Sequence, residues 1–511
     1  MNINETTTID FELSDEAVQT EEVVVSAAKI PIVQRDVSSS RANITSEEIV
    51  NLPTVNINSI LGLQAGIEAS SEGIVVRGGN VQQTEYVLNG MTLRNERDNT
   101  PYTGVSVTSI ENMQVQTGGF NAEYGNFRSG LVNIVTMEGR RDQYTFNMIG
   151  RYSPAQQKHF GISPHDPNSY WVRSYLDDAV AWTGTNNGSW DEFTQRQYAE
   201  FEGWNSISRK TLEDDDPNND LAPEAAQRLY LWEHRKQLDI VDPDYEMDMT
   251  FAGPVPGGKA LGDLRFVASY RQTTQQYLVP LSSPDYNDWS TQFKITSDIS
   301  KGMKLSIDGI YGKKIGTNDN NGGAAGVFQA PWSIATQLSQ VSFIDTRMFA
   351  SDYWAPTTII NNSIGAKFTH VINPTTFYYV RISRFGSSYE TNPGRLRDTS
   401  KIMMFGNSYW VDEAPFGFQP EPSTGIDGMR MGVGMSNSRD SSEVATYSLK
   451  FDFINQIDKF NQIKAGIDFT YSLNQTNYGS VDEFLPQGRS QSKWDSKPVR
   501  GALDVLQNST I

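Results

Sequence analysis

Residues 111–136 read ENMQVQTGGFNAEYGNFRSGLVNIVT, and this stretch decides the fold. It opens and closes with β-prone runs, residues 112–115 and 131–135, which enclose a crowded set of glycines and other small residues. Glycine permits tight turns and close backbone approach, so the stretch predicts two strands joined by a compact, glycine-rich connection.

The residues before this stretch complete one compact α/β unit over 41–140. Thr45 or Ser46 is the expected N-cap of a short helix that includes residues 46–49, and a second helical turn over 58–63 ends at Gly62 or Gly66. Residues 74–76 and 85–88 are further expected strands. The pair Asn89-Gly90 follows the second of them, and it predicts a hairpin turn in which both residues adopt positive φ. The strands together predict a small mixed sheet.

From Tyr144 onward apolar and polar residues alternate with a period of two. Each segment is close to the ~10 residues that a tilted strand needs to cross a bilayer. One face of the segments is apolar, and the other carries Lys, Asp and Glu, which suits a water-filled lumen better than a packed soluble core. The chain also has 22 Tyr, 24 Phe and 10 Trp, as the aromatic girdles of such barrels require. The alternating segments are residues 144–152, 245–251, 264–270, 289–296, 303–311, 364–368, 378–383, 446–453 and 463–471.

The connections between these segments alternate strictly between short and long. Short turns are expected at 253–262, 300–302, 373–374 and 455–461, and long polar loops at 153–244, 273–288, 316–358 and 387–442. Outer-membrane barrels have short periplasmic turns and long extracellular loops, whereas a soluble β-sandwich would not carry long loops on one side only. The connections therefore predict a membrane β-barrel with its apolar face toward lipid.

Composition excludes several other classes of protein. The net charge of −19 argues against a nucleic-acid-binding surface, and no apolar run approaches the ~18 residues of a membrane helix. The chain has 0 Cys, so it contains no disulfide and no thiol nucleophile. No catalytic triad, phosphate loop or nucleotide fingerprint is present, so we expect neither an enzyme nor a cofactor.

Weaker signals in the first long loop concern metals and aromatic residues. The acidic run 214–220 lacks the glycine and the glutamate of a calcium loop, and His159 and His165 flank no zinc motif, so no metal site is predicted. Two interpretations of the tryptophans stay open: stacking on planar ligands such as sugars, or loop-surface and girdle positions. These tryptophans are Trp171, Trp182, Trp190 and Trp204.

Residues 22–140 resemble the plug and coupling segment of TonB-dependent outer-membrane receptors. The run EEVVVSA, which on pattern alone is also typical of a sheet strand, looks like the TonB box of that family. Asn89 stands where the family more often has Asp, and it keeps the turn. Arg77 and Glu123 are expected in an ordinary plug salt bridge or a plug–barrel contact rather than in contact with substrate. Turn geometry accounts for Gly78, Gly79, Gly118 and Gly119. The TonB box residues are Glu22, Val23, Val24, Val25, Ser26 and Ala27, and the plug motif residues are Arg77, Gly78, Gly79, Asn89, Gly90, Gly118, Gly119, Glu123, Tyr124 and Gly125.

The resemblance implies four parts of the chain. Residues 1–20 look like the end of a carboxypeptidase-regulatory-like domain of Bacteroidetes-type receptors, and residues 21–40 hold the TonB box and a linker. Residues 41–140 are the small α/β plug domain. Residues 141–511 are the N-terminal part of the transmembrane β-barrel, with roughly nine of about 22 antiparallel strands. No signal peptide is visible and the strand count is odd, so we expect a longer protein that continues at both ends.

The function that the resemblance implies is active transport of a ligand across the outer membrane of a Gram-negative cell. The plug and TonB box are accessible from the periplasm, where TonB and its inner-membrane energising complex pull on the box and open a path. Other expected partners are outer-membrane lipid, a small-molecule, glycan or peptide ligand and, as a candidate, a surface lipoprotein; nucleic acid is not among them. The alternative is a surface-binding or adhesion protein on the same scaffold.

Overall fold

The computed structural model describes most of the chain between residues 41 and 480. The expected regulatory-like domain (1–20) and the expected TonB box with its linker (21–40) lie outside the described residues. The described residues are 41–52, 54–70, 73–120, 125, 127–215, 217, 219–235, 239–318, 326–330, 334, 354–392, 402–407, 409–412, 438–458 and 461–480.

The α/β unit over residues 41–140, called the plug domain here after the resemblance, is built on a mixed sheet as predicted, but the expected strand 74–76 lies outside that sheet. Five strands run in the order β1-β6-β7-β4-β5, with β4 and β7 parallel and the other pairs antiparallel. Strands β2 and β3 form a separate antiparallel pair. The elements are β1 (Arg41–Thr45), α1 (Ser46–Val50), α2 (Ile57–Leu61), β2 (Ile67–Ala69), β3 (Ile74–Val76), the 3-10 turn η1 (Val81–Gln83), β4 (Thr84–Leu88), β5 (Met91–Thr92), the 3-10 turn η2 (Val107–Ser109), β6 (Ile110–Gln116) and β7 (Gly130–Thr136).

The short helices of the plug domain begin and end where the sequence indicated. Thr45 is the N-cap of α1 in a capping box, because its hydroxyl accepts from the Glu48 amide and the Glu48 carboxylate accepts from the Thr45 amide. Helix α2 ends at Gly62. Both helices pack on a core of buried apolar residues from every strand of the mixed sheet, and Ile310 and Phe385 of the larger sheet join that core.

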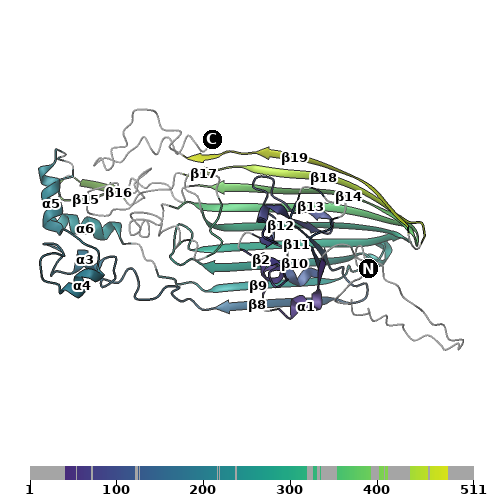
Figure 1. The fold of residues 1–511 in the computed structure, drawn as a ribbon, viewed down its shortest axis with the longest axis horizontal. Helices are drawn as coiled ribbons and strands as arrows, with labels where there is room; N and C mark the ends of the chain where they lie inside the picture. The colour runs from purple at the N-terminus through teal and green to yellow at the C-terminus, as the bar shows by residue number, and fades with distance from the viewer. Residues whose placement is uncertain are drawn as a thin grey trace. The chain divides into compact units, whose positions relative to one another are not determined.

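A second, larger sheet follows the plug domain. Nine of its eleven strands lie side by side and antiparallel in the order β19-β18-β14-β13-β12-β11-β10-β9-β8, which confirms all nine predicted segments (Figure 1). The other two, β17 (Ser438–Asp440) and β20 (Tyr478–Ser480), pair with each other, and β17 also pairs with β14. In the described residues β8 and β19 end this order and do not pair with each other, so the sheet is not closed. The strands are β8 (Thr145–Ser153), β9 (Asp244–Pro254), β10 (Arg265–Gln276), β11 (Asp285–Ser300), β12 (Met303–Thr317), β13 (Pro356–Asn373), β14 (Thr376–Thr391), β18 (Glu443–Gln456) and β19 (Gln462–Gln475).

The two faces of the large sheet have the polarity of a membrane barrel. On β11, Phe293 and Ile295 are 42% and 40% exposed, whereas the intervening Gln292 and Lys294 are only 6% and 7% exposed. The polar side chains are therefore the buried ones, because they face the plug domain, and the apolar ones point outward. This is the reverse of a soluble sheet and matches an outer face that lies in lipid.

The connections alternate between short and long as predicted, with one exception: the expected long loop between β10 and β11 is no longer than the short connection 255–264 before it. The strands are also longer than their sequence patterns. Strand β13 runs over 18 residues, whereas the clear alternation covered only 364–368. The connection between β10 and β11 shrinks to 277–284 for the same reason. No helix in the described part of the chain is both long and apolar enough to cross a membrane.

The first long connection is not the polar loop that the sequence suggested. It contains four helices, three of which share an aromatic core; Trp204 in this core is fully buried, with its ring tilted against Tyr175 and edge-on to Phe201. Trp190 is 8% exposed, and Trp182 packs against the core. Neither open interpretation of these tryptophans, ligand stacking or surface and girdle positions, fits Trp204 and Trp190, because their rings are buried in the structure. The helices are α3 (Arg173–Leu176), α4 (Glu192–Gln197), α5 (Trp204–Glu213) and α6 (Pro223–Glu233).

A hairpin from a different connection completes this helical core. Strands β15 (Ile402–Phe405) and β16 (Tyr409–Asp412) pair between β14 and β18 in the chain, and Phe405 and Tyr409 are buried among the helices. Figure 1 shows the hairpin beside α5 and α6, beyond the ends of the strands that carry the long connections. Two outer connections therefore share one core.

Candidate functional site: contacts between the plug domain and the strands

The turn at Asn89-Gly90 has the backbone conformation that the sequence predicts. Asn89 and Gly90 have φ of 51° and 90°, as a two-residue hairpin turn between β4 and β5 requires. The Asn89 amide group also binds Thr136 at the end of β7: its Oδ1 accepts from the Thr136 amide at 3.0 Å, and its Nδ2 donates to Thr136 Oγ1 at 2.9 Å. The turn therefore fastens the end of the parallel strand pair.

The other predicted motif residues include some with positive φ and one, Gly79, that packs closely against a neighbouring side chain. Gly78 and Gly119 have φ of 73° and 67°, as turn geometry predicts, and Arg77 before them also has a positive φ of 49°. Gly79 is different, because a Cβ there would lie 2.8 Å from the Ser129 Cβ. Close packing against Ser129 explains why residue 79 is a glycine, and the Gly79 amide also closes the turn by donating to the Val76 carbonyl at 3.0 Å.

The remaining motif positions divide between described and undescribed residues. Gly118 and Gly125 are described, and neither has a positive φ. A Cβ at Gly118 would lie 3.4 Å from Arg77 Nη1, which places these two motif residues side by side. Glu123 and Tyr124 lie outside the described residues, so the expected role of Glu123 as a salt-bridge or contact residue stays a prediction.

Three strand side chains donate to main-chain carbonyls of the plug domain. Arg381 Nη1 donates to the Asn89 carbonyl at 3.0 Å, Lys294 Nζ to the Thr136 carbonyl at 2.9 Å, and Ser290 Oγ to the Gly104 carbonyl at 2.7 Å. These donors come from β14 and β11, on the buried polar face of the sheet. They hold the plug domain by its backbone, and the contact does not depend on which side chains the plug carries at those positions.

Arg381 is also paired within the sheet. Its Nη2 donates to both carboxylate oxygens of Asp308 on β12, at 2.9 and 3.2 Å, and the two side chains are 1% and 3% exposed. The neighbouring carboxylate compensates a guanidinium that would otherwise be a costly buried charge. Arg381 can therefore bind the Asn89 carbonyl without a counter-charge from the plug domain.

The 3-10 turn η2 docks on one buried carboxylate, that of Asp248 on β9. Asp248 Oδ1 accepts from Ser106 Oγ at 2.6 Å and from the Thr108 hydroxyl and amide at 2.5 and 3.3 Å, while Oδ2 accepts from the Val107 amide at 2.8 Å. Asp248 is 0% exposed. Four donors around one carboxylate satisfy its charge, so the pair of η2 and Asp248 forms a specific docking point.

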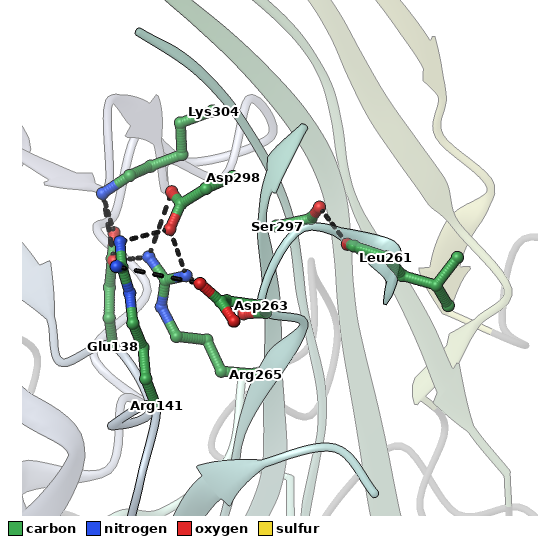
Figure 2. Close-up of polar contacts among 8 residues, drawn as sticks. All are labelled: Glu138, Arg141, Leu261, Asp263, Arg265, Ser297, Asp298 and Lys304. Atoms are coloured by element: carbon green, nitrogen blue, oxygen red, sulfur yellow. Dashed lines mark hydrogen bonds and ion pairs between the residues drawn. The ribbon is translucent and has the colours of Figure 1, made fainter. Parts of the chain in front are cut away.

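The segment that links the plug domain to β8 is held by a cluster of charges, here called the linker clasp (Figure 2). Arg265 donates to Glu138 and to Asp298, each at 2.8 Å, and Lys304 lies 3.1 Å from Glu138. Arg141 extends the cluster through a 2.6 Å ion pair with Asp298. The clasp joins the linker to β10, β11 and β12 where those strands meet their short turns. The clasp residues are Glu138, Arg141, Arg265, Asp298 and Lys304.

Two carboxyl groups of the plug domain and its linker respond differently to burial. Burial by itself would raise the pKa of Glu138, but the hydrogen bond from Arg265 and the charges of Lys294 and Lys304 outweigh it and hold that pKa below its usual range. In Glu85 on β4, burial raises the pKa, and the Thr92 hydrogen bond and the Arg94 charge offset it only in part. Glu138 is thus stabilised as an anion, whereas the charge of Glu85 is costly.

The alternating pattern predicted the polar face of the strands but not which residues on that face bind the plug domain. Asp248, Lys294 and Arg381 are each a charged residue at an inward position of a regular strand, and that signal was present. Their partners were not visible, because Arg381 and Asn89 are 292 positions apart in the chain. The alternating pattern of a strand shows which face of the sheet a side chain lies on, but it does not show which plug residue that side chain contacts.

Part of the chain is similar in sequence to known proteins. Residues 33–132 match the family model of the TonB-dependent receptor plug domain. The chain is 22% identical over 152 residues to the TonB-dependent transporter Oar of Myxococcus xanthus, which is 28% of this chain and 14% of that protein. It is 25% identical over 155 residues to the vitamin B12 transporter BtuB of Vibrio vulnificus, which is 29% of this chain and 26% of that protein.

Among solved structures, the siderophore receptor PirA from Acinetobacter baumannii is similar with a TM-score of 0.48 and 11% identity. That similarity covers 88% of this chain and 52% of the receptor. The chain thus spans about half the length of that receptor.

Proposed function

Because this chain carries the plug domain of a TonB-dependent receptor in residues 33–132, we propose that it belongs to an active transporter of the outer membrane. The plug domain closes the lumen, and force on the TonB box displaces part of it so that a ligand can pass. The observation that carries the proposal is the seating of the plug domain on the polar face of strands whose apolar face points outward.

The chemistry of that seating supports a plug that can leave and return. The polar contacts are hydrogen bonds from Arg381, Lys294 and Ser290 to plug carbonyls and the docking of η2 on Asp248, while Ile310 and Phe385 add apolar contact. Water can replace each of these bonds once the plug domain moves, because the bonds join polar groups that line a hydrated lumen. A continuous apolar interface would instead make displacement costly in proportion to its area.

The partner that supplies the force is TonB, with its inner-membrane energising complex. Residues 22–27 have the β-prone composition of a segment that adds as a strand to the edge of another sheet. Main-chain hydrogen bonds of such an added strand would carry tension into β1, the first strand of the plug domain.

A direct test of coupling uses the full-length receptor and the purified periplasmic domain of TonB. Val24→Pro removes an amide donor from the middle of the box and should abolish capture by TonB, because proline cannot donate within a strand ladder. Ser38→Pro, in the linker beyond the box, is the matched control and should leave capture intact. Equal capture of both variants would exclude residues 22–27 as the coupling segment.

A measurement of ligand uptake distinguishes the transporter from the alternative, a surface-binding or adhesion protein on the same scaffold. Deletion of residues 22–27 should abolish ligand uptake by cells while surface binding of the same ligand persists, since binding needs no energy. An adhesion protein would show neither uptake nor any effect of the deletion. The relatives that the chain matches are named as transporters and not as enzymes.

A further inference from the structure

The outer loop of the plug domain, residues 94–101, ends in a cage built by three strands. Arg97 of this loop forms a 2.7 Å ion pair with Asp440, and the two side chains are 6% and 0% exposed. The guanidinium also lies over the rings of Tyr389 and Tyr478, at 4.1 and 5.0 Å from their centroids. Asn95 of the same loop donates to the Tyr389 hydroxyl. We call Tyr389, Asp440 and Tyr478 the Arg97 cage.

Strand register explains why the three cage residues face one point. Asp440 of β17 (Ser438–Asp440) pairs with Thr391 at the end of β14 and with Tyr478 of β20 (Tyr478–Ser480). Paired residues of neighbouring strands share a face, and so do residues two apart in a strand, which places Tyr389 on the same face as Thr391. The cage lies at the end of β14 that carries the long connection, because the other end begins next to the short turn before Thr376.

The Asp440 carboxylate is fixed from both sides. Its Oδ1 accepts from the Ser442 amide at 2.9 Å, and Oδ2 faces Arg97. A carboxylate with no exposed surface is tolerated only while a counter-charge is present, because removing one partner of a buried pair leaves the other charge uncompensated. If Arg97 leaves, the Asp440 carboxylate loses its counter-charge, and β17 and β20 lose the contacts that Asp440 and Tyr478 make with the guanidinium.

We infer that Arg97 is a positioning residue that links the seating of the plug domain to the position of β17 and β20. Displacement of the plug releases this strand pair, and a shift of β17 from the outer side weakens the seat of Arg97 by the same factor, since coupling between two sites is reciprocal. The biological role of this linkage rests on the proposed transport function. The linkage itself is a property of the closed receptor and can be tested without transport.

Hydrogen–deuterium exchange on the full-length receptor, without ligand or TonB, tests the linkage. Arg97→Gln should raise amide exchange in β17 and β20 at least about tenfold, although the change lies in the plug domain. Asp440→Asn should raise exchange in residues 94–102 by a similar factor. The double variant should resemble either single one, because both break the same link. Exchange in β10–β13 reports whether the sheet has assembled.

Two further variants separate the charge from the shape of Arg97. Arg97→Lys keeps the positive charge and should retain most of the protection of the β17 amides from exchange. Arg97→Met keeps the length of the side chain without the charge and should lose that protection. Arg196→Gln, at an exposed ion pair on α4, is the matched control and should change neither segment. If Arg97→Gln fails to assemble, Tyr478→Leu removes one wall of the cage and should raise exchange in both segments by a smaller factor.

The inference is overturned if Arg97→Gln changes exchange only in the plug loop, if the two single effects multiply in the double variant, or if Met protects β17 as well as Lys. These outcomes are independent of transport, because no uptake is measured. Loss of uptake without residues 22–27, together with an absent linkage, would keep the proposed function and reject this role of Arg97.

Discussion

The docking of η2 on Asp248 predicts a local and measurable loss of contact in the variant Asp248→Asn. The asparagine oxygen can replace Oδ1 and keep the three bonds from Ser106 and Thr108, but its amide group then faces the Val107 N–H, which has lost its acceptor. One hydrogen bond to a charged group contributes ~1.5–3 kcal/mol. We therefore expect undocking of η2 to become easier by about 2–3 kcal/mol, which is roughly 30- to 150-fold.

Amide exchange of the full-length receptor measures this directly, because the Val107 and Thr108 amides are themselves the donors to Asp248. Glu246→Gln is the matched control, since Glu246 lies on the same strand and pairs with Arg151 rather than with the plug domain. An unchanged exchange rate at Val107 would refute the reasoning. An equal rise in every strand of the plug domain would also contradict it, because that result means unfolding of the plug instead of local undocking.

Three further predictions concern the turn, the linker and the outer helices. Asn89→Ala should destabilise the plug domain by about 2–3 kcal/mol in urea unfolding, because alanine disfavours positive φ and the bonds to Thr136 are lost. Glu138→Gln should lower the free energy of opening of the linker by ~1 kcal/mol. The measurement is the rate of proteolysis at residues 137–143, which should rise. Because the folded pKa of Glu138 is depressed, its contribution is complete above the unfolded value of 4.5 and is lost as the pH falls through the lower folded value, so acid should mimic the variant. Trp204→Ala should lower the free energy of unfolding of the helical unit by ~3–5 kcal/mol. The thermal melting of the strands, followed by circular dichroism, should stay unchanged.

The sequence predicted most of the strands because their signal is local. Alternation over residues 289–296 marks β11 by itself, and the Asn89-Gly90 pair requires a turn whatever surrounds it. The cap of α1 was also readable from Thr45 and Glu48. Each of these features depends on residues within a few positions of one another, so no tertiary information was needed.

The outer helices were missed because their local signals are weak. Helix α5 starts after Gly203, which has a φ of 93° and offers no capping side chain, and its stability comes from Trp204 packing on residues of other segments. Pro223 at the start of α6 was a signal that could have been used, since proline favours the first turn of a helix. The core also needs Phe405 from a connection far along the chain.

For the contacts of the candidate site, the sequence predicted which strand residues face inward but not which plug residues they bind. Inward charges such as Arg381 and Asp248 follow from strand period, but the register of the plug domain against the sheet does not. Asp308 illustrates the difference: its place on the polar face of β12 is visible in the sequence, and its pairing with Arg381 across β13 is not.

The pairing of Arg381 with Asp308 has a consequence for the lumen after the plug domain has moved. The guanidinium keeps its carboxylate partner on the neighbouring wall and needs only a water molecule in place of the Asn89 carbonyl. Lys294 and Ser290 can likewise exchange a carbonyl for water. At these positions the vacated wall is ready to hydrate without rearranging its own charges, so the same surface can receive the returning plug in cycle after cycle.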